Sequence, residues 1–198
     1  MRTAGARLYG SSSRDGGLTW SKNVPIYSSP GGTICQCCHP ALSIDETGRV
    51  WVMWRNALDG SRDLYITNSV DGVHFETAQR LGAGTWKINA CPMDGGGFAI
   101  EKGLVTSAWR REEDVFLTDP DGAERRVGAG KDVALARAKR GTYLAWTKSG
   151  AIELLKPNAA AAEPLTPKGG FATLLTLPDG SVLAAWETGE TVETKRID

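Results

Sequence analysis

The sequence predicts an all-β protein of the β-propeller class, built from blades of four antiparallel strands each. Two observations carry this prediction: an apolar run ending in tryptophan recurs along the chain, and a tight-turn motif occurs twice. In addition, hardly any segment has the apolar period of an amphipathic helix. Together these observations favour a strand-rich unit of roughly 40 to 50 residues that repeats several times, as propeller blades do.

Each repeat contains a short apolar run that follows a Gly-containing turn and ends in tryptophan. The runs are rich in β-branched and aromatic residues and are separated by Gly, Asp and Pro, a composition that predicts strands. The four copies are TGRVWVMW ending at Trp54, EKGLVTSAW ending at Trp109, KRGTYLAW ending at Trp146, and PDGSVLAAW ending at Trp186.

The repeats divide residues 1–198, a single propeller domain or a fragment of one, into successive blades. Because the chain begins and ends within a blade, we expect an incomplete set of about four to five blades. The predicted segments are a partial blade at 1–30, full blades at 33–82, 85–128 and 130–168, and a partial blade at 169–198.

Composition limits the classes of partner. The chain has 198 residues, 41% of them hydrophobic, and equal numbers of acidic and basic side chains, so it can bury a sizeable core. It carries no net charge that would attract nucleic acid or an anionic membrane surface. Apolar runs such as VWVMW and VLAAW are far too short to span a membrane. We therefore expect no nucleic-acid partner and no membrane span.

The N-terminal stretch MRTAGARLYG lacks the apolar core of a signal peptide, which leaves the localisation unknown from the sequence as given. The expected location is periplasmic or secreted if a preceding part with a signal peptide is missing.

A tight-turn motif, SRDGGLTW, occurs at residues 13–20, and a shortened form, SVDGVHF, occurs at residues 69–75. Its Ser and Asp side chains satisfy turn amides, and its glycines permit positive φ. The final aromatic ring is expected to fill the gap between neighbouring sheets. The residues with these structural roles are Ser13, Asp15, Gly17, Trp20, Ser69, Asp71 and Phe75.

This motif resembles the Asp-box, or BNR repeat, of the sialidase superfamily. Other stretches resemble bacterial exo-alpha-sialidase-like proteins, so that the resemblance covers roughly residues 5 to 198: ICQCCHPALSID, VMWRN, RDLYITNS and TWKINACPMDGGG. It implies a six-bladed propeller in the complete family fold, with the ligand at the face opposite the Asp-boxes. It also implies recognition of sialic acid or another acidic glycan, and exo-acting glycoside hydrolysis if the protein is an enzyme.

Three of the four cysteines lie in CQCCHP, and the fourth lies in NACPMD. Both stretches precede the first strand of a predicted blade, so Cys35, Cys37, Cys38 and Cys91 are expected to converge. A disulfide from the cluster to Cys91 would join two neighbouring blades. Four cysteines allow three pairings, and the sequence does not choose among them.

The same segment permits two other kinds of site. Thiolate, imidazole and thioether ligands suit copper(I) or zinc. The pattern C-x-x-C-H also matches haem attachment, which we disfavour because a third cysteine lies within it and Pro40 leads directly into a strand. We expect a structural disulfide and no cofactor, with a copper or zinc site as the alternative. The ligands of that alternative site would be Cys35, Cys37, Cys38, His39 and Cys91, with Met93 as a further thioether.

Charged residues occur where the predicted strands end at the ligand-side face. In sialidases, arginines bind the substrate carboxylate, a Glu activates a Tyr nucleophile, and an Asp is the acid/base. Each candidate here follows a repeat tryptophan, starts a third strand or begins an inner strand. The resemblance therefore implies Arg55, Arg62 and Arg110 as substrate-binding residues and Asp94, Asp132 and Glu187 as catalytic candidates.

The sequence departs from the sialidase pattern in its tyrosines. None lies in the C-terminal stretch that would supply a nucleophile, and Glu187 has no evident tyrosine partner. The tyrosines occupy strand patterns typical of packing, at Tyr9, Tyr27, Tyr65 and Tyr143.

Two functional classes remain open. The first is an exo-acting hydrolase for an acidic sugar, and the second is a propeller that binds a glycan or a protein without turnover. The charged residues also have a structural alternative, in which Arg55 and Arg110 form ion pairs with Asp63, Glu112 or Glu113.

Overall fold

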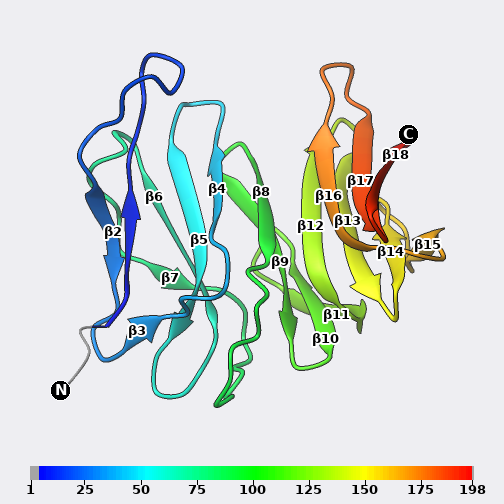
Figure 1. The fold of residues 1–198 in the computed structure, drawn as a ribbon, viewed down its shortest axis with the longest axis horizontal. Helices are drawn as coiled ribbons and strands as arrows, with labels where there is room; N and C mark the ends of the chain where they lie inside the picture. The colour runs from blue at the N-terminus through cyan, green and yellow to red at the C-terminus, as the bar shows by residue number, and fades with distance from the viewer. Residues whose placement is uncertain (1–4, 198) are drawn as a thin grey trace. The chain divides into compact units, whose positions relative to one another are not determined.

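The computed structural model describes residues 5–197, which form antiparallel β-sheets joined by turns and loops and contain no helix (Figure 1). The predicted all-β fold with antiparallel blade sheets is therefore confirmed. Residues 1–4 and 198, which belong to the first and last predicted blade segments, lie outside the described residues. Within the described part, no helix has the length and apolarity needed to cross a membrane.

The chain divides into two compact units, Met1–Met93 and Asp94–Asp198. Unit 1 contains a two-stranded sheet, in which β1 pairs with β2, and a five-stranded sheet centred on β5. Both β3 and β4 pair with one side of β5, β6 pairs with the other side, and β7 pairs with β6. The strands of unit 1 are β1 (Arg7–Gly10), β2 (Val24–Ser28), β3 (Thr33–Ile34), β4 (Ala41–Ile44), β5 (Val50–Ala57), β6 (Leu64–Ser69) and β7 (Gln79–Arg80).

The CQCCHP segment interrupts the edge of the five-stranded sheet between β3 and β4. The residues of β3 pair with Asn56 and Ala57, whereas β4 pairs with the first half of β5. The backbone N–H of Cys35 donates to the Arg55 carbonyl oxygen at 2.8 Å, directly after β3. The cysteine loop therefore leaves the sheet beside Arg55 and rejoins it as β4.

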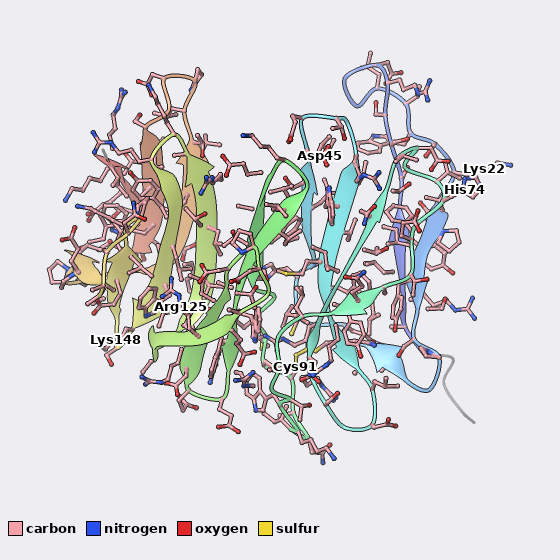
Figure 2. The ribbon with its side chains drawn as sticks, turned by 180° about the vertical axis from the view of Figure 1, so that it is seen from behind. Lys22, Asp45, His74, Cys91, Arg125 and Lys148 are labelled. Atoms are coloured by element: carbon pink, nitrogen blue, oxygen red, sulfur yellow. A yellow bond between two sulfur atoms is a disulfide. The ribbon has the colours of Figure 1, made fainter. Side chains whose placement is uncertain are left out.

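Both tight-turn motifs form hairpin connections, at residues 13–20 between β1 and β2 and at residues 69–75 between β6 and β7. In the second, the Asp71 carboxylate accepts hydrogen bonds from the backbone N–H groups of Val73 and His74, each at 2.8 Å. These bonds hold the pKa of Asp71 well below its usual range, and the bond from His74 has the largest effect. In Figure 2, His74 and Cys91 lie at opposite ends of unit 1.

The aromatic residues that end the two turns have different surroundings. Phe75 is half-buried and packs against a cluster that contains Leu8, Val52 and Trp54. Trp20 is 64% exposed, and its Nε1–H donates to the Gly17 carbonyl oxygen at 3.1 Å. The expectation that Trp20 fills a gap between sheets is therefore wrong, because the ring folds back onto its own turn.

Unit 2 contains three antiparallel sheets, each with its strands in sequence order (Figure 1). The first sheet has four strands, the second has four, and the third has three. Their strands are β8 (Gly97–Glu101), β9 (Leu104–Arg111), β10 (Asp114–Thr118) and β11 (Glu124–Ala129); β12 (Lys131–Ala138), β13 (Gly141–Lys148), β14 (Ala151–Leu155) and β15 (Glu163–Thr166); and β16 (Gly170–Thr176), β17 (Val182–Thr188) and β18 (Thr191–Ile197).

The repeat tryptophans are buried in β5, β9, β13 and β17. In two sheets of unit 2, a glycine before the first strand lets the backbone pass close to the indole. A Cβ added at Gly130, which has φ of +144°, would lie 2.4 Å from Cδ1 of Trp146. A Cβ added at Gly169 would lie 2.6 Å from Cδ1 of Trp186. The Gly–Trp pair is thus a structural feature of the repeat.

Candidate functional site

Three of the predicted site residues lie together in unit 2. Asp94 precedes β8, and Asp132 is the second residue of β12. The Asp94 carboxylate accepts the backbone N–H of Asp132 through Oδ2 at 3.0 Å and the N–H of Gly96 through Oδ1 at 3.3 Å. Asp94 is 2% exposed. It therefore joins the beginnings of the first strands of two adjacent sheets.

The Asp132 carboxyl group is poorly satisfied in its surroundings. Its side chain is 13% exposed, and its buried Oδ2 accepts no hydrogen bond from any residue that the structure describes. The Lys131 Nζ lies 3.6 Å from Oδ2, beyond hydrogen-bond range. Burial raises the pKa of Asp132, and the neighbouring Asp94 charge adds to this, while Lys131 and Arg110 oppose it. Burial thus disfavours the ionised form of this carboxyl group.

Arg110 completes this charged group from the end of β9. Its side chain is 19% exposed, Nε–H donates to the Glu112 carbonyl oxygen at 2.5 Å, and Nη2 lies 3.3 Å from Oε1 of Glu113. The predicted structural pairing of Arg110 with Glu113 is therefore present. The Glu113 side chain is 90% exposed, so this ion pair is open to solvent.

Two residues near Asp132 were not predicted from the sequence. Lys131 directly precedes Asp132, and its Nζ lies 5.8 Å from the ring centroid of Phe171. The Phe171 side chain is 61% exposed, so its ring is open to solvent beside Lys131. One sequence signal was available: Phe171 lies two residues after Gly169, just as Asp132 lies two residues after Gly130 in the preceding repeat.

The third catalytic candidate, Glu187, lies in β17, where its backbone pairs with Gly170 and Val192. Its side chain is exposed. Glu187 therefore lies near the start of β16, in a different sheet from β8 and β12. The hydrogen bond between Asp94 and Asp132 does not include it.

The four tyrosines lie in strands, where two of them pack in an aromatic cluster. Tyr27 and Tyr65 pack with Trp54, with ring centroids 4.6 and 6.2 Å from the indole. Burial raises the pKa of Tyr65, which disfavours its phenolate form. Tyr143 is buried, and Tyr9 is 49% exposed in β1.

Arg55 and Arg62 belong to unit 1, whereas Arg110 belongs to unit 2. Arg55 is 1% exposed, and its Nη1 donates to the Arg62 carbonyl oxygen at 2.5 Å. Its guanidinium lies over the Trp86 ring, 5.5 Å from the centroid. Asp63 accepts hydrogen bonds from Arg80, Thr85 and the backbone of Trp86. The substrate-binding role of Arg55 and Arg62 stays a prediction.

The four cysteines of unit 1 converge at the end of the sheet opposite the second tight turn. Cys37 forms a disulfide with Cys91, so the predicted link between the cluster and Cys91 is present (Figure 2). The Cys35 sulfur lies 3.3 Å from that of Cys38 and 3.8 Å from those of Cys37 and Cys91. All four sulfur atoms lie within 4.8 Å of one another.

Cys35 has an unusually acidic thiol. Its pKa is lowered from 9.0 to about 6 by the hydrogen bond with Cys38, and the charges of Arg62 and Arg55 contribute further. Burial acts in the opposite direction. The adjacent His39 side chain is exposed and outside the group of sulfur ligands, and Met93 is 72% exposed.

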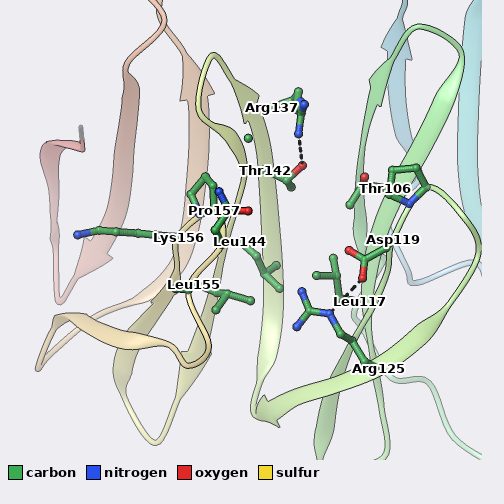
Figure 3. A pocket seen from close by; sticks show the side chains of 14 residues that line it. Thr106, Leu117, Asp119, Arg125, Arg137, Thr142, Leu144, Leu155, Lys156 and Pro157 are labelled. Carbon is green, nitrogen blue, oxygen red and sulfur yellow. Dashed lines mark hydrogen bonds and ion pairs between the residues drawn. The ribbon is translucent and has the colours of Figure 1, made fainter.

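A cavity of about 250 Å³ lies elsewhere in unit 2 (Figure 3). Its polar lining includes Arg137, which donates to Thr142 at 3.4 Å, and Arg125, which donates to Asp119 at 3.2 Å. These residues come from strand ends opposite those that carry Asp132 and Arg110. None of the predicted site residues lines this cavity.

The antiparallel blade sheets and their buried repeat tryptophans are those of a β-propeller fold, and one solved structure supports this fold. The chain is similar to a leech intramolecular trans-sialidase complexed with 2,7-anhydro-Neu5Ac and prepared by soaking with 3'-sialyllactose, with a TM-score of 0.55 and 14% identity. The match covers 97% of this chain and 36% of that structure, so the chain spans about a third of it. No family model and no curated protein sequence matches the chain.

Two further similar structures are glycoside hydrolases. A xylan β-1,4-xylosidase from Bacillus halodurans C-125 has a TM-score of 0.47 and 15% identity, covering 79% of this chain and 40% of that structure. An engineered GH43 enzyme with endo-xylanase and exo-arabinofuranosidase activity has a TM-score of 0.48 and 14% identity, covering 90% and 43%. The fold assignment rests on the trans-sialidase, which confirms the predicted resemblance at the level of fold.

Proposed function

We propose that this chain recognises an acidic glycan through the charged group of unit 2, formed by Arg110, Asp94, Lys131 and Asp132. The observation that carries the proposal is the buried Oδ2 of Asp132, which lacks a hydrogen-bond partner among the described residues, lies 3.6 Å from Lys131 Nζ and is subject to the charge of Arg110. An unsatisfied buried polar atom costs stability and calls for an explanation, and use by a ligand is the explanation that fits a carboxyl group in a charged cluster.

Arg110 is the residue that would bind the glycan carboxylate. Its planar guanidinium matches a carboxylate in a two-point contact, which a lysine does not reproduce. Its ion-pair partner Glu113 is largely exposed, and exposed ion pairs of this kind contribute only about 0 to 1 kcal/mol. A ligand carboxylate can therefore displace Glu113 at small cost.

Phe171 and Asp132 would bind the rest of the sugar. The exposed Phe171 ring offers an apolar surface for the C–H face of a sugar, close to Lys131. Asp132 would contact a sugar hydroxyl through Oδ2, which has no hydrogen-bond partner among the described residues. Sialic acid is the specific ligand we propose, supported by the fold shared with the trans-sialidase.

Glycoside hydrolysis is the second candidate function, and the raised pKa of Asp132 favours it. A carboxyl group with a raised pKa can act as the general acid in glycosidases, with a second carboxylate nearby. Asp94 occupies the second position. The packing of the tyrosines supports binding without a covalent tyrosine intermediate.

The cysteines support a location outside the reducing cytosol. Disulfides persist in oxidising compartments, and Cys37–Cys91 is one. We therefore include a periplasmic or secreted location in the proposal.

Calorimetric titration with 3'-sialyllactose and with neutral lactose tests the binding proposal. We expect binding of the sialylated sugar only, weakening as salt is added, and a loss of about tenfold or more, or about 1.4 kcal/mol, in Arg110→Lys. The matched control is Arg125→Lys, which alters an arginine of the separate cavity and should bind normally. Equal affinity for lactose, or equal effects of the two substitutions, would contradict the proposal.

Release of a fluorogenic aglycone from a sialoside separates the two candidate functions. Turnover that disappears in Asp132→Asn, with binding retained, would establish hydrolysis with Asp132 as the acid. Binding without turnover in the unaltered chain would establish a recognition module.

A further inference from the structure

The four cysteine sulfurs of unit 1 form a group that the glycan site does not use. Three come from the loop between β3 and β4, and the fourth comes from a segment more than fifty residues further along the chain, with a separation of 54 for the disulfide pair. We propose that, once the Cys37–Cys91 disulfide is reduced, Cys35, Cys37, Cys38 and Cys91 bind one Zn²⁺ ion as a tetrahedral tetrathiolate site.

The spacing of the sulfurs fits this coordination. A zinc–sulfur distance of about 2.3 Å in a regular tetrahedron places the sulfurs about 3.8 Å apart. The Cys35 sulfur lies 3.8 Å from those of Cys37 and Cys91 and 3.3 Å from that of Cys38. On reduction, the Cys37 and Cys91 sulfurs must separate to the same spacing, and both residues are exposed and have room to do so.

The backbone holds the ligands in place without the disulfide. Cys35 is fixed to β5 by its hydrogen bond to the Arg55 carbonyl oxygen at 2.8 Å. The segment that leads to Cys91 is fixed to the loop between β5 and β6, because Arg62 N–H donates to Trp86 O at 2.8 Å and Ile88 N–H donates to Gly60 O at 3.2 Å. Reduction therefore releases the Cys91 sulfur without removing these backbone anchors.

Burial and charge also suit a metal ion. Cys35 and Cys38 are 6% exposed, while Cys37 and Cys91 are exposed, so the site has a buried half and an open entry side. A zinc ion with four thiolates carries two net negative charges. Arg62 and Arg55 act electrostatically on the Cys35 sulfur and would offset that charge.

The conversion from disulfide to zinc site balances in electrons and protons. A dithiol reductant transfers two electrons and two protons to the Cys37–Cys91 disulfide, giving two thiols, and is itself oxidised to a disulfide. The four cysteines then bind Zn²⁺ as thiolates, and each thiol that is still protonated releases its proton to the solvent. The disulfide and the zinc site exclude each other, so metal occupancy would depend on the redox conditions around the protein.

Metal stoichiometry in the two redox states tests this inference. The 198-residue chain is reduced with a phosphine, supplied with zinc chloride under argon, dialysed against metal-free buffer and measured by elemental analysis. We expect one zinc per chain, with all four cysteines protected from alkylation until a chelator is added. The oxidised chain should retain essentially none. Cobalt(II) in place of zinc should give the intense visible absorption of a tetrahedral thiolate complex.

Matched variants assign the ligands. Cys38→Ser should lose the stoichiometric zinc, whereas His39→Ala, which alters the next residue and leaves all four sulfurs in place, should retain it. Substoichiometric zinc in the reduced wild-type chain, or equal loss in both variants, would overturn the inference. So would copper(I) binding without zinc binding, since this would indicate a site with fewer thiolates. Alkylation protection of the wild-type chain tests the site even if Cys38→Ser does not fold.

Discussion

The Cys37–Cys91 disulfide should contribute measurably to the stability of unit 1, and Cys91→Ser removes it with a change of one atom. The disulfide closes a segment with a sequence separation of 54, for which the chain-entropy relation gives a loss of about 4 kcal/mol on removal. The backbone hydrogen bonds of Arg62 and Ile88 remain in the variant. The loss of stability therefore comes mainly from the greater conformational entropy of the unfolded chain, and less from lost native contacts.

Urea unfolding in the presence of a chelator, followed by tryptophan fluorescence, measures this difference. Reduction of the wild-type chain with a phosphine should give the same loss as Cys91→Ser, and reduction of Cys91→Ser should change nothing further. A loss below about 1 kcal/mol, with an unchanged dependence on urea, would refute the reasoning. It would show that residues 37 and 91 stay close in the unfolded chain without a covalent link.

Three further predictions concern the repeat and the charged site. Gly130→Ala should lower the stability by about 1 to 3 kcal/mol more than Gly150→Ala, because only the first places a Cβ 2.4 Å from Trp146; thermal unfolding of both variants checks this. Trp146→Ala should cost about 3 to 5 kcal/mol, whereas Trp20→Ala, at a residue 64% exposed, should cost less than about 1 kcal/mol in urea unfolding. At pH 7, Asp132→Asn should raise the midpoint of thermal unfolding, because burial raises the Asp132 pKa above 3.8 and the ionised form destabilises the folded chain. This gain should shrink as the pH falls through the folded-state pKa and vanish below 3.8, where both states are protonated; a gain that persists at low pH would contradict the assignment.

The strand class and the tryptophan repeat were predictable from the sequence, because period and turn residues determine them locally. Trp109 and Trp146 each end an apolar run after a Gly-containing turn, and both are buried in their strands. The surroundings of Trp20 were not predictable, since the motif around it fixes the turn but does not specify what covers the ring. The interruption between β3 and β4 also needed the structure, because strand pairing with β5 determines it.

The sequence identified residues of the charged site but did not predict the pKa of Asp132. Sequence placed Asp94 and Asp132 at the beginnings of inner strands, where the structure joins them by a hydrogen bond. The raised pKa of Asp132 depends on burial, which the sequence does not report. The positive φ of Asp132, 54°, recurs as 52° at Phe171, so it arises from the repeat and needs no functional explanation. Phe171 itself has no motif, and its exposure became apparent only in the fold.

Nitrogen-edited NMR of the chain during titration with 3'-sialyllactose tests the proposed glycan site most directly. The account predicts that the Nε–H signal of Arg110 and the backbone signals of Asp132 and Phe171 shift with saturation, and that lactose leaves them unchanged. Signals near Cys35 should stay in place in both titrations. Shifts confined to the cavity around Arg125 and Arg137, or no shifts with the sialylated sugar, would contradict the assignment of the site to Arg110 and Asp132.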